Sequence, residues 1–76
     1  MDPLANYILD LGNLLKRDAL STMQHRAAAA STDTSFWDGK LLAYSEVLSL
    51  MLSQAAAFGM DPKCLGLDGF DPDKDL

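Results

Sequence analysis

Cysteine and histidine are almost absent from this sequence, because Cys64 is the single cysteine and His25 the single histidine. One cysteine cannot form an internal disulfide, and a lone thiol is more common in reducing compartments than in secreted proteins. One cysteine and one histidine also fall short of the four ligands of a structural zinc site. We therefore expect a cytoplasmic protein that uses neither a metal nor another cofactor.

Long apolar runs are missing as well. No segment reaches the roughly 18 consecutive apolar residues that indicate a membrane-spanning helix. The chain opens with MDPLANYILDLGNLLKRD, in which charged residues interrupt the apolar pattern, unlike the pattern of a signal peptide. The sequence therefore predicts a soluble protein that does not bind a membrane.

Positive charge is scarce. Six lysine and arginine residues stand against eleven aspartate and glutamate residues, which gives a net charge of −5. Nucleic-acid binding needs a positive face that contacts phosphates, so this class of partner is disfavoured. An acidic surface keeps a small protein soluble, and it also suits a protein partner with a basic surface.

Groups that could carry out catalysis are not arranged together in the sequence. His25 has no serine or cysteine at a spacing that would make a base and nucleophile pair, and Cys64 is expected to be a small buried apolar residue. The acidic ending DGFDPDKDL lacks the glycine and glutamate positions of a calcium-binding loop. We predict no catalytic, cofactor-binding or metal-binding residue, and a protein that is not an enzyme.

What the sequence does contain is a pattern for two helices in a single domain that spans residues 1–76. Asp2 and Pro3 form a cap-and-proline start, and the apolar spacing that follows predicts a helix over about 3–29. Ser35 is expected to cap a second helix over about 35–58, which Gly59 would end in the left-handed conformation.

Residues 59–76 are expected to form a capping turn and an acidic tail. Asp61 and Pro62 repeat the cap-and-proline signal and predict one short turn. Asp71 and Pro72 repeat it once more, too near the end for a real helix. The fold class is therefore all-α, a two-helix antiparallel hairpin with a short turn and tail, because the short connection makes the helices antiparallel neighbours.

The second helix has more apolar surface than one neighbouring helix can cover. Its apolar arc spans roughly 200°, against the ~100° stripe of a helix with a single neighbour. The arc divides into two seams, and the pattern does not decide which of them faces the first helix. The first seam consists of Trp37, Leu41, Tyr44, Leu48, Met51, Ala55 and Phe58. The second consists of Phe36, Ala43, Val47, Leu50 and Ala57, interrupted by Lys40 and Gln54.

Three arrangements could cover the seam that remains. A second copy would complete a four-helix bundle, the tail could fold back with its large apolar residues, or a different protein could bind. A chain of 76 residues buries only a small core. We favour the second copy, because a tail containing three glycines and two prolines is expected to cap an end rather than line a seam.

These patterns predict a small acidic homodimeric module for protein–protein interaction, such as an inhibitor, immunity or regulatory protein that acts by binding another protein. The alternatives are a structural or accessory dimer with no further partner and, less favoured, a small ligand-binding bundle or enzyme. The predicted interface residues are Trp37, Leu41, Tyr44, Leu48 and Leu52, with Leu9 and Leu20 at its margin.

Overall fold

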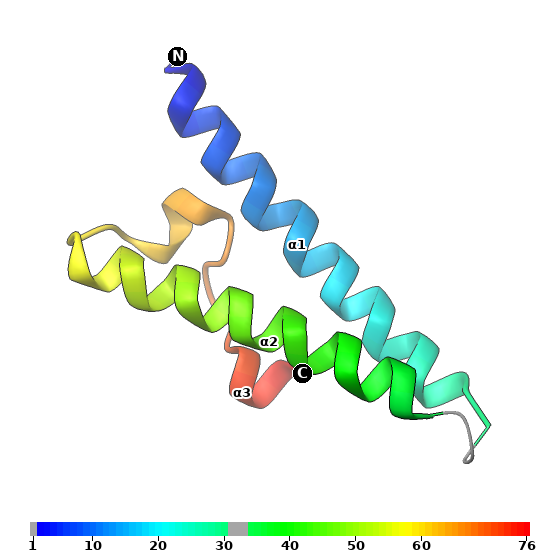
Figure 1. Cartoon of the computed structure of the whole chain (residues 1–76). Helices are drawn as coiled ribbons and strands as arrows, with labels where there is room; N and C mark the ends of the chain where they lie inside the picture. Colours follow the sequence, from blue (N-terminus) through cyan, green and yellow to red (C-terminus); the bar gives the residue numbers. More distant parts are fainter. Residues whose placement is uncertain (1, 31–33) are drawn as a thin grey trace.

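The computed structural model describes residues 2–30 and 34–76, and these residues form helices, turns and connecting segments without any strand. Two long helices, α1 (Pro3–Ala28) and α2 (Thr34–Ala57), make a hairpin. A short 3₁₀ helix, η1 (Pro62–Leu65), and a one-turn helix, α3 (Pro72–Asp75), follow. Figure 1 shows that α1 and α2 lie close together near their connection and diverge toward the opposite end. The all-α hairpin prediction is thereby confirmed.

The start of α1 is set by its first two residues. Asp2 is the N-cap, and its carboxylate accepts a hydrogen bond from the backbone N–H of Leu4 at 3.0 Å. Pro3 occupies the first helical position, where its missing N–H costs no hydrogen bond. The helix ends at Ala28, one residue before the predicted end, with His25 and Arg26 in its last turn.

The end of α2 is a Schellman motif. The N–H of Met60 donates to the carbonyl of Ala55 at 2.7 Å, and the N–H of Gly59 donates to the carbonyl of Ala56 at 3.1 Å. Gly59 has a φ of +67°, which glycine adopts without steric cost. The predicted role of Gly59 is confirmed.

At its N-terminal end, α2 begins at Thr34, so Ser35 lies inside the helix and is not its cap. The rest of the expected polar turn, residues 31–33, lies outside the described residues.

The segment after α2 is part of the hydrophobic core. Leu65 is 5% exposed and Leu67 is fully buried, and together with Ala19, Leu48 and Ala55 they form the buried cluster. The expectation that residues 59–76 only cap one end is therefore wrong. Figure 1 shows that the chain after α2 runs through the opening between the diverging helices, so its leucines fill space that the two helices leave between them.

Gly12 is where η1 contacts α1. A Cβ atom at this position would lie 1.6 Å from the carbonyl oxygen of Leu65, far inside any possible contact. The next turn of the segment contains Gly66 at a φ of +70°, and a Cβ there would lie 2.7 Å from the side chain of Asn13. The two glycines allow the backbone of the segment to approach the α1 surface closely.

The final turn, α3, packs beneath α2. Asp71 accepts from the N–H of Asp73 at 2.9 Å, while the N–H of Asp71 donates to the Asp75 carboxylate at 2.8 Å. Phe70 and Leu76 on either side of this turn pack against the buried cluster. The prediction that the third cap-and-proline signal stands too near the end for a helix is wrong, because capping and this packing support a single turn.

Candidate protein-interaction surface

Of the seven predicted interface residues, one is buried, five are partly buried and one is exposed. Leu48 is fully buried, so it is a core residue and offers no surface to a partner. Tyr44 and Leu52 are partly buried and pack against the core cluster, and Trp37 and Leu41 are also partly buried. On α1, Leu20 is partly buried, while Leu9 is exposed.

The first apolar seam of α2 is the one that faces the core. Its residues Leu48 and Ala55 are buried, and Tyr44 and Met51 pack against them. This assignment was left open by the sequence pattern. It follows that the second seam points away from the rest of the chain.

That second seam is exposed along the length of α2, and we call it the outer stripe. The fractional exposure is 66% for Phe36, 44% for Val47 and 61% for Leu50. Ala43 and Ala57 are exposed as well. The tail does not cover these residues, because Phe70 and Leu76 pack on the core cluster instead. The outer stripe is therefore an apolar helix face with no partner among the described residues.

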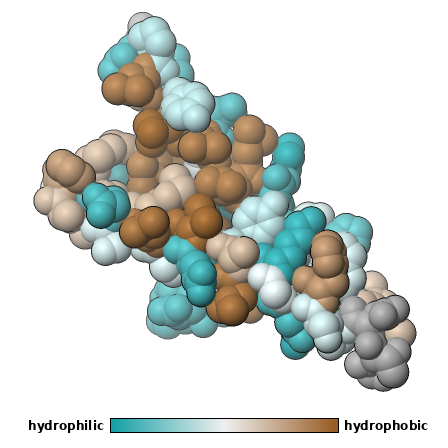
Figure 2. All heavy atoms as spheres, in the orientation of Figure 1, coloured by the Kyte–Doolittle hydropathy of each residue, from teal (hydrophilic) through white to brown (hydrophobic). Residues whose placement is uncertain are grey.

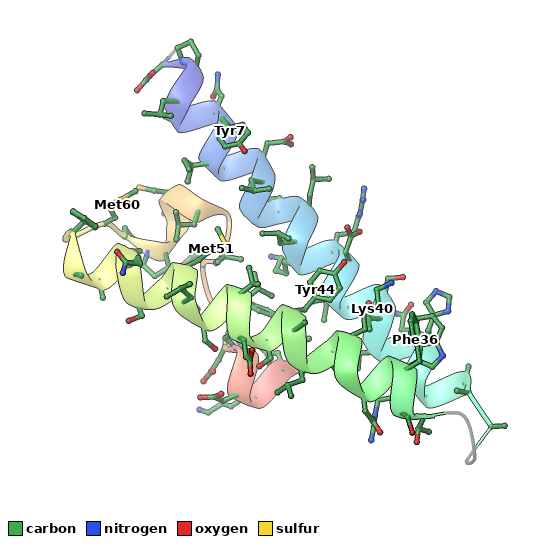
Figure 3. All side chains as sticks on the ribbon, in the orientation of Figure 1. Tyr7, Phe36, Lys40, Tyr44, Met51 and Met60 are labelled. Atoms are coloured by element: carbon green, nitrogen blue, oxygen red, sulfur yellow. The ribbon has the colours of Figure 1, made fainter. Side chains whose placement is uncertain are left out.

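A second apolar feature, which we call the apolar groove, lies in the opening between the diverging helices and has a volume of about 560 Å³. Its lining consists of Asp2, Leu4, Ala5, Ile8, Met51, Gln54, Ala55, Phe58, Met60, Cys64 and Leu65. Figure 2 shows hydrophobic residues gathered over this opening. In Figure 3, Met51 projects from α2 toward the opening, and Met60 lies where the chain turns from α2 toward η1.

The groove exists because the two helices diverge. Leu4, near the start of α1, is 68% exposed at the groove margin. Phe58 is 77% exposed on the opposite margin, at the C-terminal end of α2. Both margins thus present large apolar side chains to water. The interface prediction omitted both residues, although the apolar spacing of each helix includes them.

Charged groups are distributed unevenly around these surfaces. The stretch 47–60 contains no charged residue, and Asp2 is the one charged residue that lines the groove. Ion pairs occur near the other end of the hairpin, where Arg26 pairs with Asp38, and along α1, where Arg17 pairs with Asp18 at 3.0 Å. All four side chains are substantially exposed, so the pairs contribute little to stability.

Aromatic stacking occupies Trp37 within the chain. Its ring stacks on His25 with centroids 4.8 Å apart and an interplanar angle of 12°. Phe36 meets it edge-on at 4.9 Å, and the ammonium of Lys40 lies 5.4 Å from the centre of the indole. The single histidine is exposed, as expected, and its visible role is this stack. Trp37 therefore supports the hairpin.

Cys64 departs from expectation, because it is exposed rather than buried. It lies on the wall of the groove and not in the core.

Within residues 2–30 and 34–76, no cluster of three or more histidine, cysteine or acidic side chains is placed to hold a metal ion. None of the helices in these described residues is long and apolar enough to cross a membrane.

Comparison of the chain with protein-family models, with curated proteins and with solved structures found no match. What the protein binds is therefore inferred from its own surface. Two features stand out on that surface, namely the outer stripe and the apolar groove.

Proposed function

We propose that this protein is an interaction module that binds a helical segment of another protein in the apolar groove. The observation that supports the proposal is the groove itself, whose walls are almost entirely apolar and whose margins hold Leu4 and Phe58 largely in water. Monomeric soluble proteins rarely leave large contiguous apolar surfaces exposed, and such surfaces commonly mark interaction sites.

The energy available from this burial is substantial for a small protein. Complete burial of a leucine, phenylalanine or methionine side chain contributes about 1.5–3 kcal/mol. Leu4, Phe58 and Met60 are 68%, 77% and 41% exposed. Scaled by these fractions, their burial contributes about 3–6 kcal/mol on this side of an interface. The apolar side chains of a partner would add a comparable amount.

The expected partner segment is an amphipathic helix with basic residues beside its apolar face. An apolar face fits the groove, because amphipathic helices bind grooves through side chains spaced three and four residues apart. Basic flanks fit the surroundings, because Asp2 lines the groove, Asp61 directly follows Met60, and the whole chain carries a charge of −5. The protein would act by occupying the partner's surface, as an inhibitor, immunity or regulatory protein does.

A small-molecule site is a weaker interpretation of the same groove. Its volume falls within the range of about 300–1,000 Å³ that is common for ligand pockets. Such pockets usually also place several polar groups to orient the ligand. Here the polar side chains on the lining are Asp2, Gln54 and Cys64, and none of the three is buried. The groove therefore suits apolar side chains better than a polar metabolite.

The outer stripe favours a second candidate function, a structural or accessory dimer with no further partner. The stripe is separate from the groove over most of its length, because Phe36, Ala43 and Val47 do not line the groove. The two functions are compatible, since one surface can join two copies while the other binds a partner.

The proposed function can be tested with Leu4→Asp, measured against Leu42→Asp as a matched control. Leu4 and Leu42 are 68% and 60% exposed, but only Leu4 lines the groove. The probe is a fluorescent amphipathic peptide of leucine, alanine and lysine, and fluorescence anisotropy measures its binding. We expect Leu4→Asp to weaken peptide binding about tenfold or more. The variant loses the apolar contact of the leucine, and this loss exceeds the attraction between the new carboxylate and the lysines of the peptide.

The control variant and a second peptide make the result decisive. Leu42→Asp adds the same negative charge without touching the groove, so it should bind the peptide at least as well as the unmodified protein. A version of the peptide with glutamate in place of lysine should bind less well. Equal binding by the Leu4→Asp and Leu42→Asp variants would contradict the proposal.

A further inference from the structure

We infer that the outer stripe joins two copies of this chain through antiparallel pairing of α2 with α2 of the second copy. The two-fold axis of this dimer would pass close to Val47 and Leu50. The inference deepens the second candidate function by giving the geometry of the dimer, and it is independent of the proposed binding in the apolar groove, because it concerns a different surface and a different occupant.

The spacing of the outer stripe is that of a helix–helix seam. The positions 36, 40, 43, 47, 50, 54 and 57 alternate in steps of four and three, as the core positions of a coiled coil do. Among residues 2–30 and 34–76 nothing covers this seam, since α1, η1 and the residues that flank α3 pack against the core cluster. A second helix is the element that such spacing accommodates.

The charge distribution allows two copies of the chain to meet at the outer stripe. Two molecules that each carry a charge of −5 repel one another wherever their acidic residues meet. The outer stripe is the helix face on which this does not happen, because Lys40 is its single charged residue and the stretch 47–60 has none. Two outer stripes can therefore meet without burying a carboxylate.

The antiparallel direction follows from Lys40. A parallel pair would bring the two Lys40 ammonium groups together, which is unfavourable. In an antiparallel pair centred between Val47 and Leu50, Lys40 lies opposite Ala57 of the second copy and Ala43 lies opposite Gln54. Each lysine then meets a small uncharged residue, and the two ammonium groups lie at opposite ends of the seam.

The area of the stripe is sufficient for a stable pair. A whole aromatic side chain buries about 150–250 Å². With 66% of its surface exposed, Phe36 alone offers about 100–165 Å² per copy. The other stripe residues add to this area, and two copies together bring the total toward the ~1,000 Å² expected of a specific interface. These residues are Lys40, Ala43, Val47, Leu50, Gln54 and Ala57.

Sedimentation equilibrium between about 1 and 500 μM tests the dimer directly. The chain has a mass of 8.2 kDa, and we expect twice that mass at the upper concentrations. Leu50→Asp should weaken dimerisation about 100-fold, because each dimer loses two leucine contacts and buries two carboxylates. Leu42→Asp, which lies outside the stripe on the solvent-facing side of α2, should leave it unchanged. Far-UV circular dichroism confirms that both variants fold, which is expected because both leucines are about 60% exposed.

Cysteine crosslinking tests the position of the axis. In a Cys64→Ser background, a mixture of Val47→Cys and Leu50→Cys chains should oxidise to a disulfide-linked dimer, because an axis between these residues places position 47 of one copy opposite position 50 of the other. Ser49→Cys is the control, since this exposed residue lies outside the stripe and should not crosslink.

Three outcomes would overturn the inference. They are a monomer throughout the concentration range, equal crosslinking in the Val47→Cys and Leu50→Cys mixture and in Ser49→Cys, and equal loss of dimer in the Leu42→Asp variant. A monomer that binds phosphatidylcholine vesicles through Leu50 would assign the stripe to a membrane surface instead. The groove remains a separate question, because Leu4→Asp should leave the dimer intact while Leu50→Asp leaves peptide binding intact.

Discussion

Replacing Gly12 with alanine should destabilise this protein, although the same change in an exposed helix interior is stabilising. Gly12 is buried in the middle of α1, where the carbonyl of Leu65 contacts the helix. The added Cβ would lie 1.6 Å from that oxygen, whereas an ordinary contact needs at least 3.4 Å. The three nearest atoms all belong to the backbone of Leu65, so the segment around η1 must move away from α1 by about 2 Å or more.

The cost follows from the leucines that this movement releases. Leu65 is 5% exposed and Leu67 is fully buried. Exposing both costs about 3–6 kcal/mol, at about 1.5–3 kcal/mol for each side chain. The better helix propensity of alanine offsets about 1 kcal/mol of this cost. The free energy of unfolding should therefore fall by about 2–5 kcal/mol, a large part of the total that is usual for a chain of this length.

Urea and thermal unfolding followed by circular dichroism measure this change, and Gly39→Ala is the matched control. Gly39 lies in the interior of α2, and an added Cβ there has no atom within 4 Å. Gly39→Ala should therefore raise the stability by about 0.5–1 kcal/mol, while Gly12→Ala lowers the melting temperature by about 4–8 °C for each kcal/mol lost.

Hydrogen exchange identifies the segment that moves. The N–H of Leu67 donates to the carbonyl of Pro62 at 3.1 Å, and its protection should decrease in Gly12→Ala more than that of the amides within α1. The reasoning would be refuted if Gly12→Ala were as stable as Gly39→Ala, since the carbonyl of Leu65 would then not lie against α1.

Two further predictions concern Leu48 and Cys64, whose burial in the structure differs from the burial that the sequence predicted. Leu48→Ala should lower the free energy of unfolding by about 2–5 kcal/mol, because it leaves a cavity at a fully buried position; a small effect would place Leu48 on the surface. Cys64 should react with a thiol reagent in the folded protein nearly as fast as in urea, because its side chain is exposed. Strong protection in the folded state would indicate a covered groove.

The interaction surface could be predicted only in part. The sequence identifies α2 as a helix with two apolar seams, and the structure confirms that one seam is buried and the other exposed. The predicted interface lay mainly on the seam that turned out to face the core, with Leu48 at its centre. The first seam is the more apolar of the two, because Lys40 and Gln54 interrupt the second. This difference alone did not decide which seam faces α1, and the packing of α1 and the tail does.

What the sequence by itself determines are the features that depend on neighbouring residues. The cap at Asp2, the first helical proline and the left-handed Gly59 each act through hydrogen bonds or backbone geometry within one or two turns. Helix boundaries within one residue of the observed ones follow from such local signals. The net charge and the single thiol are likewise properties of composition.

The tertiary structure decides how the helices diverge and what fills the space between them. By helix propensity alone, Gly12 destabilises the interior of α1. In the structure it is the position against which the carbonyl of Leu65 packs. That contact joins residues far apart in the chain, and its stability depends on shape complementarity, which no local pattern records. The apolar groove and the exposed outer stripe both result from this docking, because a tail that fills the core leaves those two surfaces uncovered.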